Sequence, residues 1–258
     1  MAGAGFNSLR IYTLHPPVFY EKLANYNQRH PDNPLLLFQG IWLEEIEDYT
    51  DPGSYDLLNQ TSSFTKEIKE VINCINGNGD IAYRYGKSYG RYITDVSRWT
   101  AGYIIGREIS PQEVDTTDNR HPSLNSYTGT YLSITGAKAT EVFCTQMLEQ
   151  TIKYEASNYS VRRPVSISSW PTLDPLNHPT ETYTDEDKAA YDLAKITLKN
   201  PEPGIFASYH AYPYYPNFIS EPPSYRTYNA PEGPNSNVGY LNDLRYHYSS
   251  MPLVIAEF

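Results

Sequence analysis

The chain has 258 residues, with thirty acidic against twenty basic side chains and a formal net charge of −10. No Lys/Arg run is dense enough to follow a phosphate backbone, which argues against nucleic acid as a partner. No stretch reaches the roughly 18 apolar residues of a membrane-spanning helix, and Met1 to Arg10 lacks an export-signal pattern, so we expect no membrane insertion by this segment.

Short apolar runs alternate with helix-length amphipathic segments, which indicates βα units around a parallel sheet. The first expected strand is Ser8 to Thr13, and a helix runs from Pro16-Pro17 to about Arg29, since proline is tolerated in a first helical turn. Leu35 to Leu43 is a nearly continuous apolar run, typical of a strand covered on both faces. Glu44 and Glu45 follow it, so their carboxylates lie at a strand end.

The middle of the chain predicts two helices, a strand and a long loop. Apolar residues at helical spacing indicate a helix from about Ser63 to Ile75, and a second helical stretch is expected near Tyr89 to Trp99. Gly102 to Gly106 is expected to be a strand that carries Arg107 and Glu108 at its carboxyl end. A polar loop follows from Ser110 to about Ala137.

The last part of the chain predicts three more strands and three helices. Thr140 to Asn158 has one apolar face and is the clearest helix of the chain. The remaining expected elements, in chain order, are the strand Pro164 to Ser168 ending at Trp170, the helix Asp185 to Leu198, the strand Gly204 to Ser208 leading into Tyr209-His210-Ala211-Tyr212, the helix from Gly233–Asn237 to about Tyr248, and the strand Pro252 to Ala256, which delivers Glu257.

The cysteines and histidines give no sign of a metal or a cofactor. Cys74 and Cys144 are too few for a disulfide framework and lack metal-ligand spacing, so we expect two buried, inert thiols. No His/Asp/Glu group shows metal-ligand spacing in the sequence either. We therefore expect no catalytic metal and no cofactor.

Several strand ends resemble those of clan A glycoside hydrolases, the superfamily of family 2 β-galactosidases, and most closely those of poorly characterised bacterial barrel domains related to family 2. Gly5 to Ile11 resembles the second barrel strand, whose Arg, here Arg10, lies beneath the active site. Gly102 to Glu108 resembles the fourth strand and Met251 to Phe258 the seventh. The resemblance implies one (β/α)₈ TIM barrel over residues 1–258, incomplete because the first and eighth strands are absent, and a fragment of a longer protein with flanking domains.

The resemblance also implies a function. It predicts a retaining glycoside hydrolase, or a transglycosidase, that acts on an oligosaccharide or polysaccharide, with Glu108 as acid/base and Glu257 as nucleophile. Apolar surroundings and the second carboxylate would keep Glu108 protonated near neutral pH. The predicted substrate-binding residues are Arg10, Glu44, Arg107, Trp170, Tyr209, His210 and Tyr212, of which one of the last three would hydrogen-bond Glu257.

One position departs from the clan's pattern and keeps other functions open. Arg107 stands where the clan usually has an Asn that binds the sugar's 2-hydroxyl. If its guanidinium entered the pocket, it would suit an anionic sugar. The alternatives are a catalytically inactive glycan-binding barrel and a structural domain of a larger carbohydrate-processing protein. The sequence leaves the localisation open, including a parent protein outside the cytoplasm or on a membrane.

Overall fold

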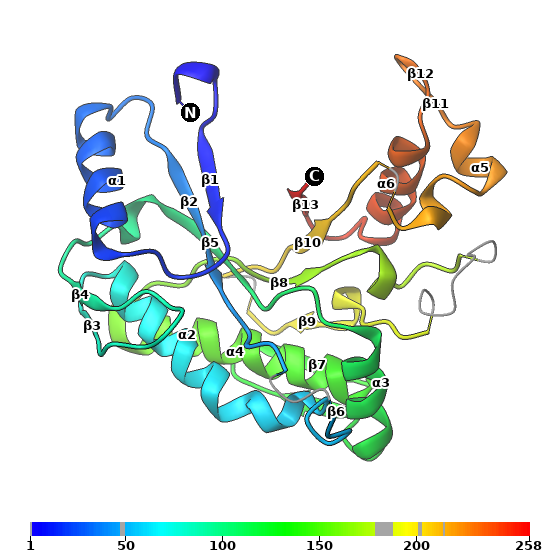
Figure 1. The fold of residues 1–258 in the computed structure, drawn as a ribbon, viewed down its shortest axis with the longest axis horizontal. Coiled ribbons are helices and arrows are strands. Elements are labelled where there is room, and N and C mark those ends of the chain that lie inside the picture. Colours follow the sequence, from blue (N-terminus) through cyan, green and yellow to red (C-terminus); the bar gives the residue numbers. More distant parts are fainter. Residues whose placement is uncertain (1, 47–49, 179–187, 201–202, 214) are drawn as a thin grey trace.

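A six-stranded parallel sheet forms the centre of the protein, which is mixed α/β (Figure 1). The computed structural model describes residues 2–46, 50–178, 188–200, 203–213 and 215–258. Along the sheet the strands follow their order in the chain: β1 (Ser8–Ile11), β2 (Leu36–Ile41), β5 (Thr100–Ile105), β8 (Val165–Ser169), β10 (Ala207–His210) and β13 (Leu253–Glu257). Every neighbouring pair is parallel, and the sheet curls into a half-barrel. All six predicted strands are confirmed.

Helices connect these strands and cover the sheet. Four of the six predicted helices are confirmed: α1 (Pro17–Arg29), α2 (Thr61–Ile75), α4 (Ala139–Tyr159) and α6 (Ser236–His247). α2 packs on α4, and α4 also contacts β8. The short helices are η1 (Ala2–Ala4), η2 (Leu57–Gln60), η3 (Ser97–Trp99), η4 (Pro171–Leu173), η5 (Leu193–Lys195), η6 (Asn217–Ile219) and α5 (Pro223–Arg226).

Three small antiparallel sheets lie in the connections. The first pairs β3 (Gly79–Ile81) with β4 (Gly90–Tyr92), the second joins β6 (Ser126–Thr128), β7 (Leu132–Thr135) and β9 (Thr197–Leu198), and the third pairs β11 (Asn229–Ala230) with β12 (Gly233–Pro234).

Three predictions about the connections are wrong. The expected helix near Tyr89 to Trp99 is instead β4 followed by η3, because β4 pairs with β3 and this pairing outweighs the helical spacing. Of the expected helix Asp185 to Leu198, residues 185–187 lie outside the described part, and the rest forms only η5 before β9 pairs with β7. The expected loop Ser110 to Ala137 contains α3 (Pro111–Arg120) and the β6–β7 hairpin.

The sequence did contain a signal for α3. The Ser110 side chain accepts a hydrogen bond from the Glu113 amide, while the Glu113 carboxylate accepts one from the Ser110 amide. This capping box, with Pro111 in the first helical position, marks a helix start.

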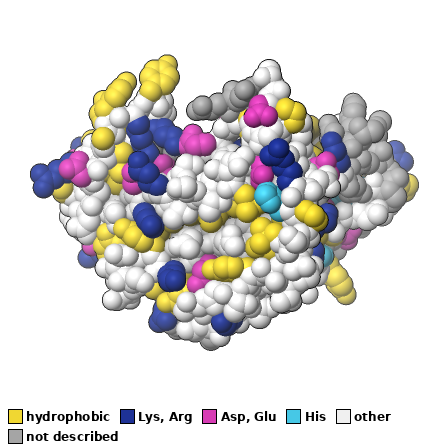
Figure 2. All heavy atoms as spheres, turned by 90° about the horizontal axis from the view of Figure 1, so that it is seen from below, with side chains coloured by type: hydrophobic (Ala, Val, Ile, Leu, Met, Phe, Trp, Pro, Cys, Tyr) yellow, Lys and Arg dark blue, Asp and Glu magenta, His cyan; other side chains and the backbone are white. Residues whose placement is uncertain are grey.

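The buried apolar side chains form one cluster around the sheet and its helices. Cys74 and Cys144 are free and buried, as predicted, and burial raises the pKa of Cys74 to about 12, so this thiol stays protonated. Among the described helices, none is both long and apolar enough to cross a bilayer. On the face shown in Figure 2, basic side chains are dispersed among acidic and apolar ones.

One ion pair is buried under the amino-terminal end of the sheet. Glu155 on α4 pairs with Arg163, and it also accepts a hydrogen bond from the Tyr103 hydroxyl at 2.6 Å. The guanidinium further donates to the carbonyl oxygens of Thr100 and Ser97. Burial raises the pKa of Glu155, and the charge of Arg163 opposes this rise. The pair fastens α4 to the segment that precedes β8.

Removing the carboxylate of this pair tests how much it contributes to stability. We expect Glu155→Ala to lower the free energy of unfolding by about 3–5 kcal/mol, because Arg163 then stays buried without its counter-ion. Lys66→Ala, which removes an exposed i,i+4 pair with Glu70, should cost less than about 0.5 kcal/mol. Urea unfolding followed by circular dichroism measures the free energy of unfolding of both variants. An equal decrease in the two would contradict a special contribution of the buried pair to stability.

Candidate active site

The candidate site lies where the carboxyl ends of the parallel strands meet. Arg10 belongs to β1, Glu108 follows β5, His210 is the last residue of β10 and Glu257 the last of β13. A cavity of about 380 Å³ opens here, and both glutamates and His210 line it. Carboxyl ends of parallel strands are the usual place for ligand sites in α/β proteins.

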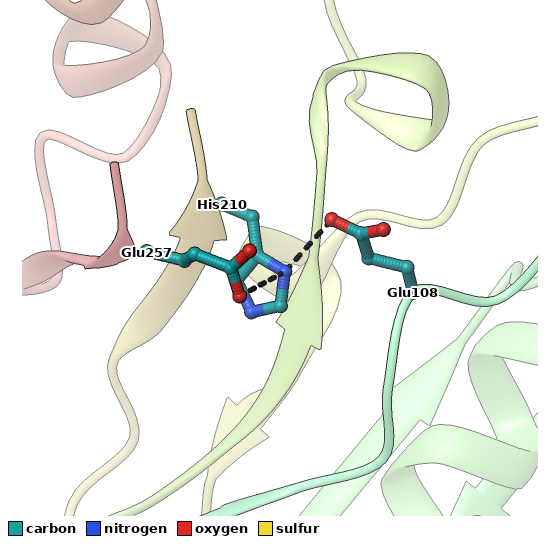
Figure 3. A group of neighbouring side chains, drawn as sticks. All are labelled: Glu108, His210 and Glu257. Atoms are coloured by element: carbon teal, nitrogen blue, oxygen red, sulfur yellow. Dashed lines mark hydrogen bonds and ion pairs between the residues drawn. The ribbon is translucent and has the colours of Figure 1, made fainter. Parts of the chain in front are cut away.

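The two predicted carboxylates meet at one imidazole (Figure 3). His210 Nδ1 lies 2.8 Å from Glu108 Oε1 and 3.5 Å from Glu257 Oε2. One side-chain oxygen of each glutamate and one ring nitrogen of His210 all lie within 4.8 Å of one another. The His210 side chain is only 4% exposed, whereas those of Glu108 and Glu257 are 40% and 30% exposed. A buried ring thus holds two carboxylates that reach the cavity.

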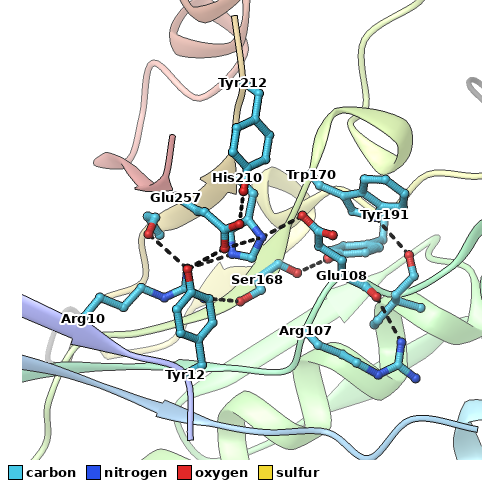
Figure 4. Close-up of polar contacts among 12 residues, drawn as sticks. Arg10, Tyr12, Arg107, Glu108, Ser168, Trp170, Tyr191, His210, Tyr212 and Glu257 are labelled. Carbon is cyan, nitrogen blue, oxygen red and sulfur yellow. Dashed lines mark hydrogen bonds and ion pairs between the residues drawn. The ribbon is translucent and has the colours of Figure 1, made fainter. Parts of the chain in front are cut away.

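Arg10 supports this cluster from β1 (Figure 4). Its Nη1 atom lies 2.8 Å from His210 Nε2 and donates to the Ala256 carbonyl oxygen at 3.0 Å, while Nη2 donates to Ser168 Oγ at 3.1 Å. Nη1 also lies 4.0 Å from Glu257 Oε2. Burial lowers the pKa of Arg10 and the neighbouring negative groups oppose this, but a guanidinium remains protonated in proteins. Arg10 therefore connects β1 with β8, β10 and β13.

Two phenols bind the Glu257 carboxylate. Tyr212 donates to Oε1, and Tyr12 donates to Oε2 at 2.5 Å. Burial, followed by the hydrogen bond and charge of Glu257, raises the pKa of Tyr12 to about 12. Tyr12 therefore keeps its proton at neutral pH and donates its hydrogen bond to Glu257.

Two glycines make room for this arrangement. A Cβ atom on Gly40 would lie 2.3 Å from the carbonyl oxygens of Ile11 and Tyr12, so only glycine lets β2 approach the end of β1 so closely. Gly106 has a φ of +82°, and a Cβ there would lie 2.9 Å from Ile167. Glycine is the residue that adopts this conformation without strain. Gly106 thereby directs the chain from β5 toward Glu108.

Arg107 lines the cavity, but its charge is already compensated. Its Nη2 and Nη1 atoms donate to the two carboxylate oxygens of Glu113 at 2.6 and 3.0 Å. The guanidinium also donates to the carbonyl oxygens of Glu44 and Glu108. Its side chain is 7% exposed and that of Glu113 is 2% exposed. The predicted fork for an anionic sugar is therefore occupied by the protein itself.

Of the predicted substrate-binding residues, Arg107 and His210 line the cavity, and Arg10 and Tyr212 contact the residues that line it. The other three, Tyr209, Trp170 and Glu44, have different partners. Tyr209 is fully buried, and its hydroxyl lies 3.0 Å from that of Tyr248 on the far side of the sheet. Side chains alternate along a strand, so Tyr209 and His210 face opposite sides. The Trp170 indole donates to the Ile109 carbonyl oxygen at 2.9 Å, and Glu44 pairs with Lys87.

Sequence reasoning missed several residues of the cavity wall. Trp42, Ile46 and Tyr55 line it, as does Glu45 in place of Glu44. The predicted strand Leu35 to Leu43 includes Trp42 as an apolar strand residue, whereas β2 ends one residue earlier, at Ile41. Tyr12 could have been found, because it lies two residues after Arg10 and so shares its side of the strand.

Among the described residues, Glu108, His210 and Glu257 are the group whose ligand atoms lie close enough to hold a metal ion. Their separation along the chain hid this cluster from an analysis of sequence spacing. No family model, curated protein or solved structure matches this chain. The geometry of the cavity therefore carries the functional argument.

The pairing of Arg107 predicts a stability effect. Arg107→Met should lower the free energy of unfolding by about 3–5 kcal/mol, because it leaves the Glu113 carboxylate buried without a partner. The double variant with Glu113→Gln should recover much of the loss, since glutamine is uncharged and can still accept from the Ser110 amide. Chemical unfolding of the wild type, both single variants and the double variant measures the coupling; additive losses would contradict it.

Proposed function

We propose that this protein is a retaining glycoside hydrolase or a transglycosidase that acts on an oligosaccharide or polysaccharide. The observation that carries the proposal is the convergence of Glu108 and Glu257 on one cavity, with oxygens within 4.8 Å of each other. Retaining enzymes have their two carboxyl groups about 5–5.5 Å apart, whereas inverting enzymes separate them by about 6.5–9.5 Å. The close spacing favours the retaining class.

Glu257 is suited to the role of nucleophile. Its carboxylate accepts hydrogen bonds from Tyr12 and Tyr212 and lies 4.0 Å from the Arg10 guanidinium, so two donors and a cation face its oxygens. In the first step a Glu257 oxygen forms a bond to the anomeric carbon as the glycosidic C–O bond breaks. The two phenols hold the carboxylate in one orientation for this attack.

Glu108 is suited to the role of acid/base. In the first step it gives its proton to the departing glycosidic oxygen, and in the second it takes a proton from the water or sugar hydroxyl that attacks the glycosyl-enzyme. His210 Nδ1 lies 2.8 Å from Glu108 Oε1. When this nitrogen carries a proton and donates a hydrogen bond to Oε1, the proton of the Glu108 carboxyl group belongs on Oε2. The 40% exposed side chain reaches leaving group and water alike. The sequence predicted that Glu108 would be buried among apolar side chains. Its side chain is instead partly exposed, and its polar partner is His210.

The cavity favours a neutral sugar. Glu113 compensates the charge of Arg107, and Glu45, Glu108 and Glu257 line the same space, so an anionic ring would meet carboxylates rather than a free cation. Trp42 and Tyr55 line the wall and add aromatic surface of the kind that can pack against the C–H groups of a sugar. We therefore place a neutral glycan ahead of a uronic acid.

We further propose that the curled sheet is strands two to seven of a (β/α)₈ barrel of the clan A type. The strand order along the sheet and its curvature around Arg10 support this. A second, apolar cavity of about 610 Å³, lined by Phe38, Phe206 and Val254, lies toward the amino ends of the strands. Two further strands between the edges β1 and β13 would cover that surface and close the barrel.

A catalytically inactive glycan-binding barrel is the second candidate. It is favoured by the Arg107–Glu113 pair, which occupies the place where the clan's Asn would contact the sugar. Such a domain would bind the same glycan without cleaving it.

A screen of aryl glycosides, with glucuronides and galacturonides included, tests the proposal. We expect turnover of a neutral glycoside that falls to background in Glu257→Gln. Glu108→Gln should slow the reaction by about 10²–10⁴-fold for poor leaving groups and by less for activated ones. Glu21→Gln is the matched control, since it changes an exposed carboxylate of α1 that does not line the cavity and should keep activity.

Each alternative outcome has a distinct meaning. Full activity in Glu257→Gln would remove Glu257 from the nucleophile role. Glycan binding to the wild type without turnover of any substrate would favour the inactive barrel.

The carboxyl spacing also predicts the stereochemistry. Proton NMR of the first-formed sugar should show the same anomeric configuration as the substrate, because two successive displacements restore it. A first product of inverted configuration would contradict the role of Glu257 as a covalent nucleophile.

A further inference from the structure

His210 lies between a cation and two carboxylates. Its Nε2 atom is 2.8 Å from Arg10 Nη1, and its Nδ1 atom is 2.8 Å from Glu108 Oε1 and 3.5 Å from Glu257 Oε2. The ring is almost completely buried. Its hydrogen-bond pattern is therefore set by these neighbours.

The contact with Arg10 decides which ring nitrogen carries the proton. A guanidinium only donates hydrogen bonds, so Nε2 of His210 must be the acceptor. A neutral imidazole has a single N–H group, which is then on Nδ1 and points at Glu108 Oε1, with Glu257 Oε2 next to it. We propose that Arg10 is a positioning residue that locks His210 in its Nδ1–H tautomer and so closes the Glu108–His210–Glu257 cluster to divalent metal ions.

The three groups would otherwise suit a metal, because their ligand atoms lie within 4.8 Å of one another beside an open cavity. A metal bound to Nδ1 would need that nitrogen without its proton, and the proton would then move to Nε2. There it would face the N–H of Arg10 at hydrogen-bond distance, donor against donor. The positive charge of Arg10, 4.0 Å from Glu257 Oε2, further disfavours a cation.

Arg10 cannot easily move aside to relieve this conflict. It also donates to the Ala256 carbonyl oxygen and to Ser168 Oγ, and leaving buried acceptors without a partner is costly. These two anchors keep the guanidinium against Nε2. The lock is a property of the resting protein, so it does not depend on the proposed glycosidase activity.

The tautomer can be measured directly in the wild-type protein by ¹⁵N NMR of the histidine rings at neutral pH. The signals of His210 are assigned as those that disappear in His210→Asn or, should that variant not fold, by single substitutions of the other histidines. We expect a protonated Nδ1 and an unprotonated Nε2. An Nε2–H tautomer, or a doubly protonated ring, would overturn the proposal. The measurement is made on the wild type, so it does not depend on whether an Arg10 variant folds.

Zinc titration by calorimetry tests whether Arg10 prevents the cluster from binding a divalent metal ion. Arg10→Met should bind Zn²⁺ about 10- to 100-fold more tightly than the wild type, the range in which hydrogen bonds to a ligand histidine alter metal affinity. The gain should vanish in Arg10→Met/His210→Gln, which separates this cluster from other zinc sites. Arg29→Met, a change at an exposed residue of α1, should leave zinc binding unchanged.

Two further results keep the proposal falsifiable. Ser168→Ala removes one anchor but leaves the Arg10–His210 contact, so the Nδ1–H tautomer should persist in it. Tight zinc binding by the wild type that is lost in Glu108→Gln and in His210→Asn would overturn the proposal. If Arg10→Met does not fold, the wild-type tautomer and the wild-type zinc titration still decide it.

Discussion

The guanidinium of Arg10 connects the two edges of the central sheet. Arg10 belongs to the edge strand β1, and its guanidinium donates to the Ala256 carbonyl oxygen on β13, the opposite edge strand. In a flat sheet, five spacings of about 4.8 Å would separate these edges by about 24 Å, far beyond the reach of an arginine side chain. The contact therefore requires the sheet to curl. Between its two edges, Arg10 also contacts Ser168 on β8 and His210 on β10.

This curvature creates the site. Glu108 follows a strand in the middle of the sheet and Glu257 ends an edge strand, so only a curled sheet brings their carboxylates within 4.8 Å. Two carboxylates at this distance repel each other, and the surrounding donors offset the repulsion: two phenols on Glu257, an imidazole on Glu108, and Arg10 behind the imidazole. The same donors that permit the close approach also fix its geometry.

The sequence predicted the sheet well because each strand is a short apolar run that ends in polar residues. The apolar runs alone did not select Glu108 and Glu257, because Glu44 also follows such a run and pairs with Lys87. The resemblance of two strand ends to a known pattern singled them out. The errors arose where tertiary pairing or side-chain parity decides the outcome. Strand β4 exists because β3 lies beside it, and Tyr209 points away from the cavity because it is one residue out of phase with His210. The pairing of β3 with β4 is not encoded in local composition, whereas the orientation of Tyr209 could have been found by counting along the strand.

Arg107 has a structural role at the end of β5. It pairs with Glu113 at the start of α3 and donates to the backbone carbonyl oxygen of Glu108, so it ties the end of β5 to the helix that follows. Under the proposed function, an Asn at this position would bind the sugar, whereas Arg107 instead fixes the backbone at the acid/base Glu108. On that proposal the sugar's 2-hydroxyl would need hydrogen-bond partners elsewhere on the wall, and the carboxylates of Glu45, Glu108 and Glu257 on the cavity would disfavour an anionic sugar.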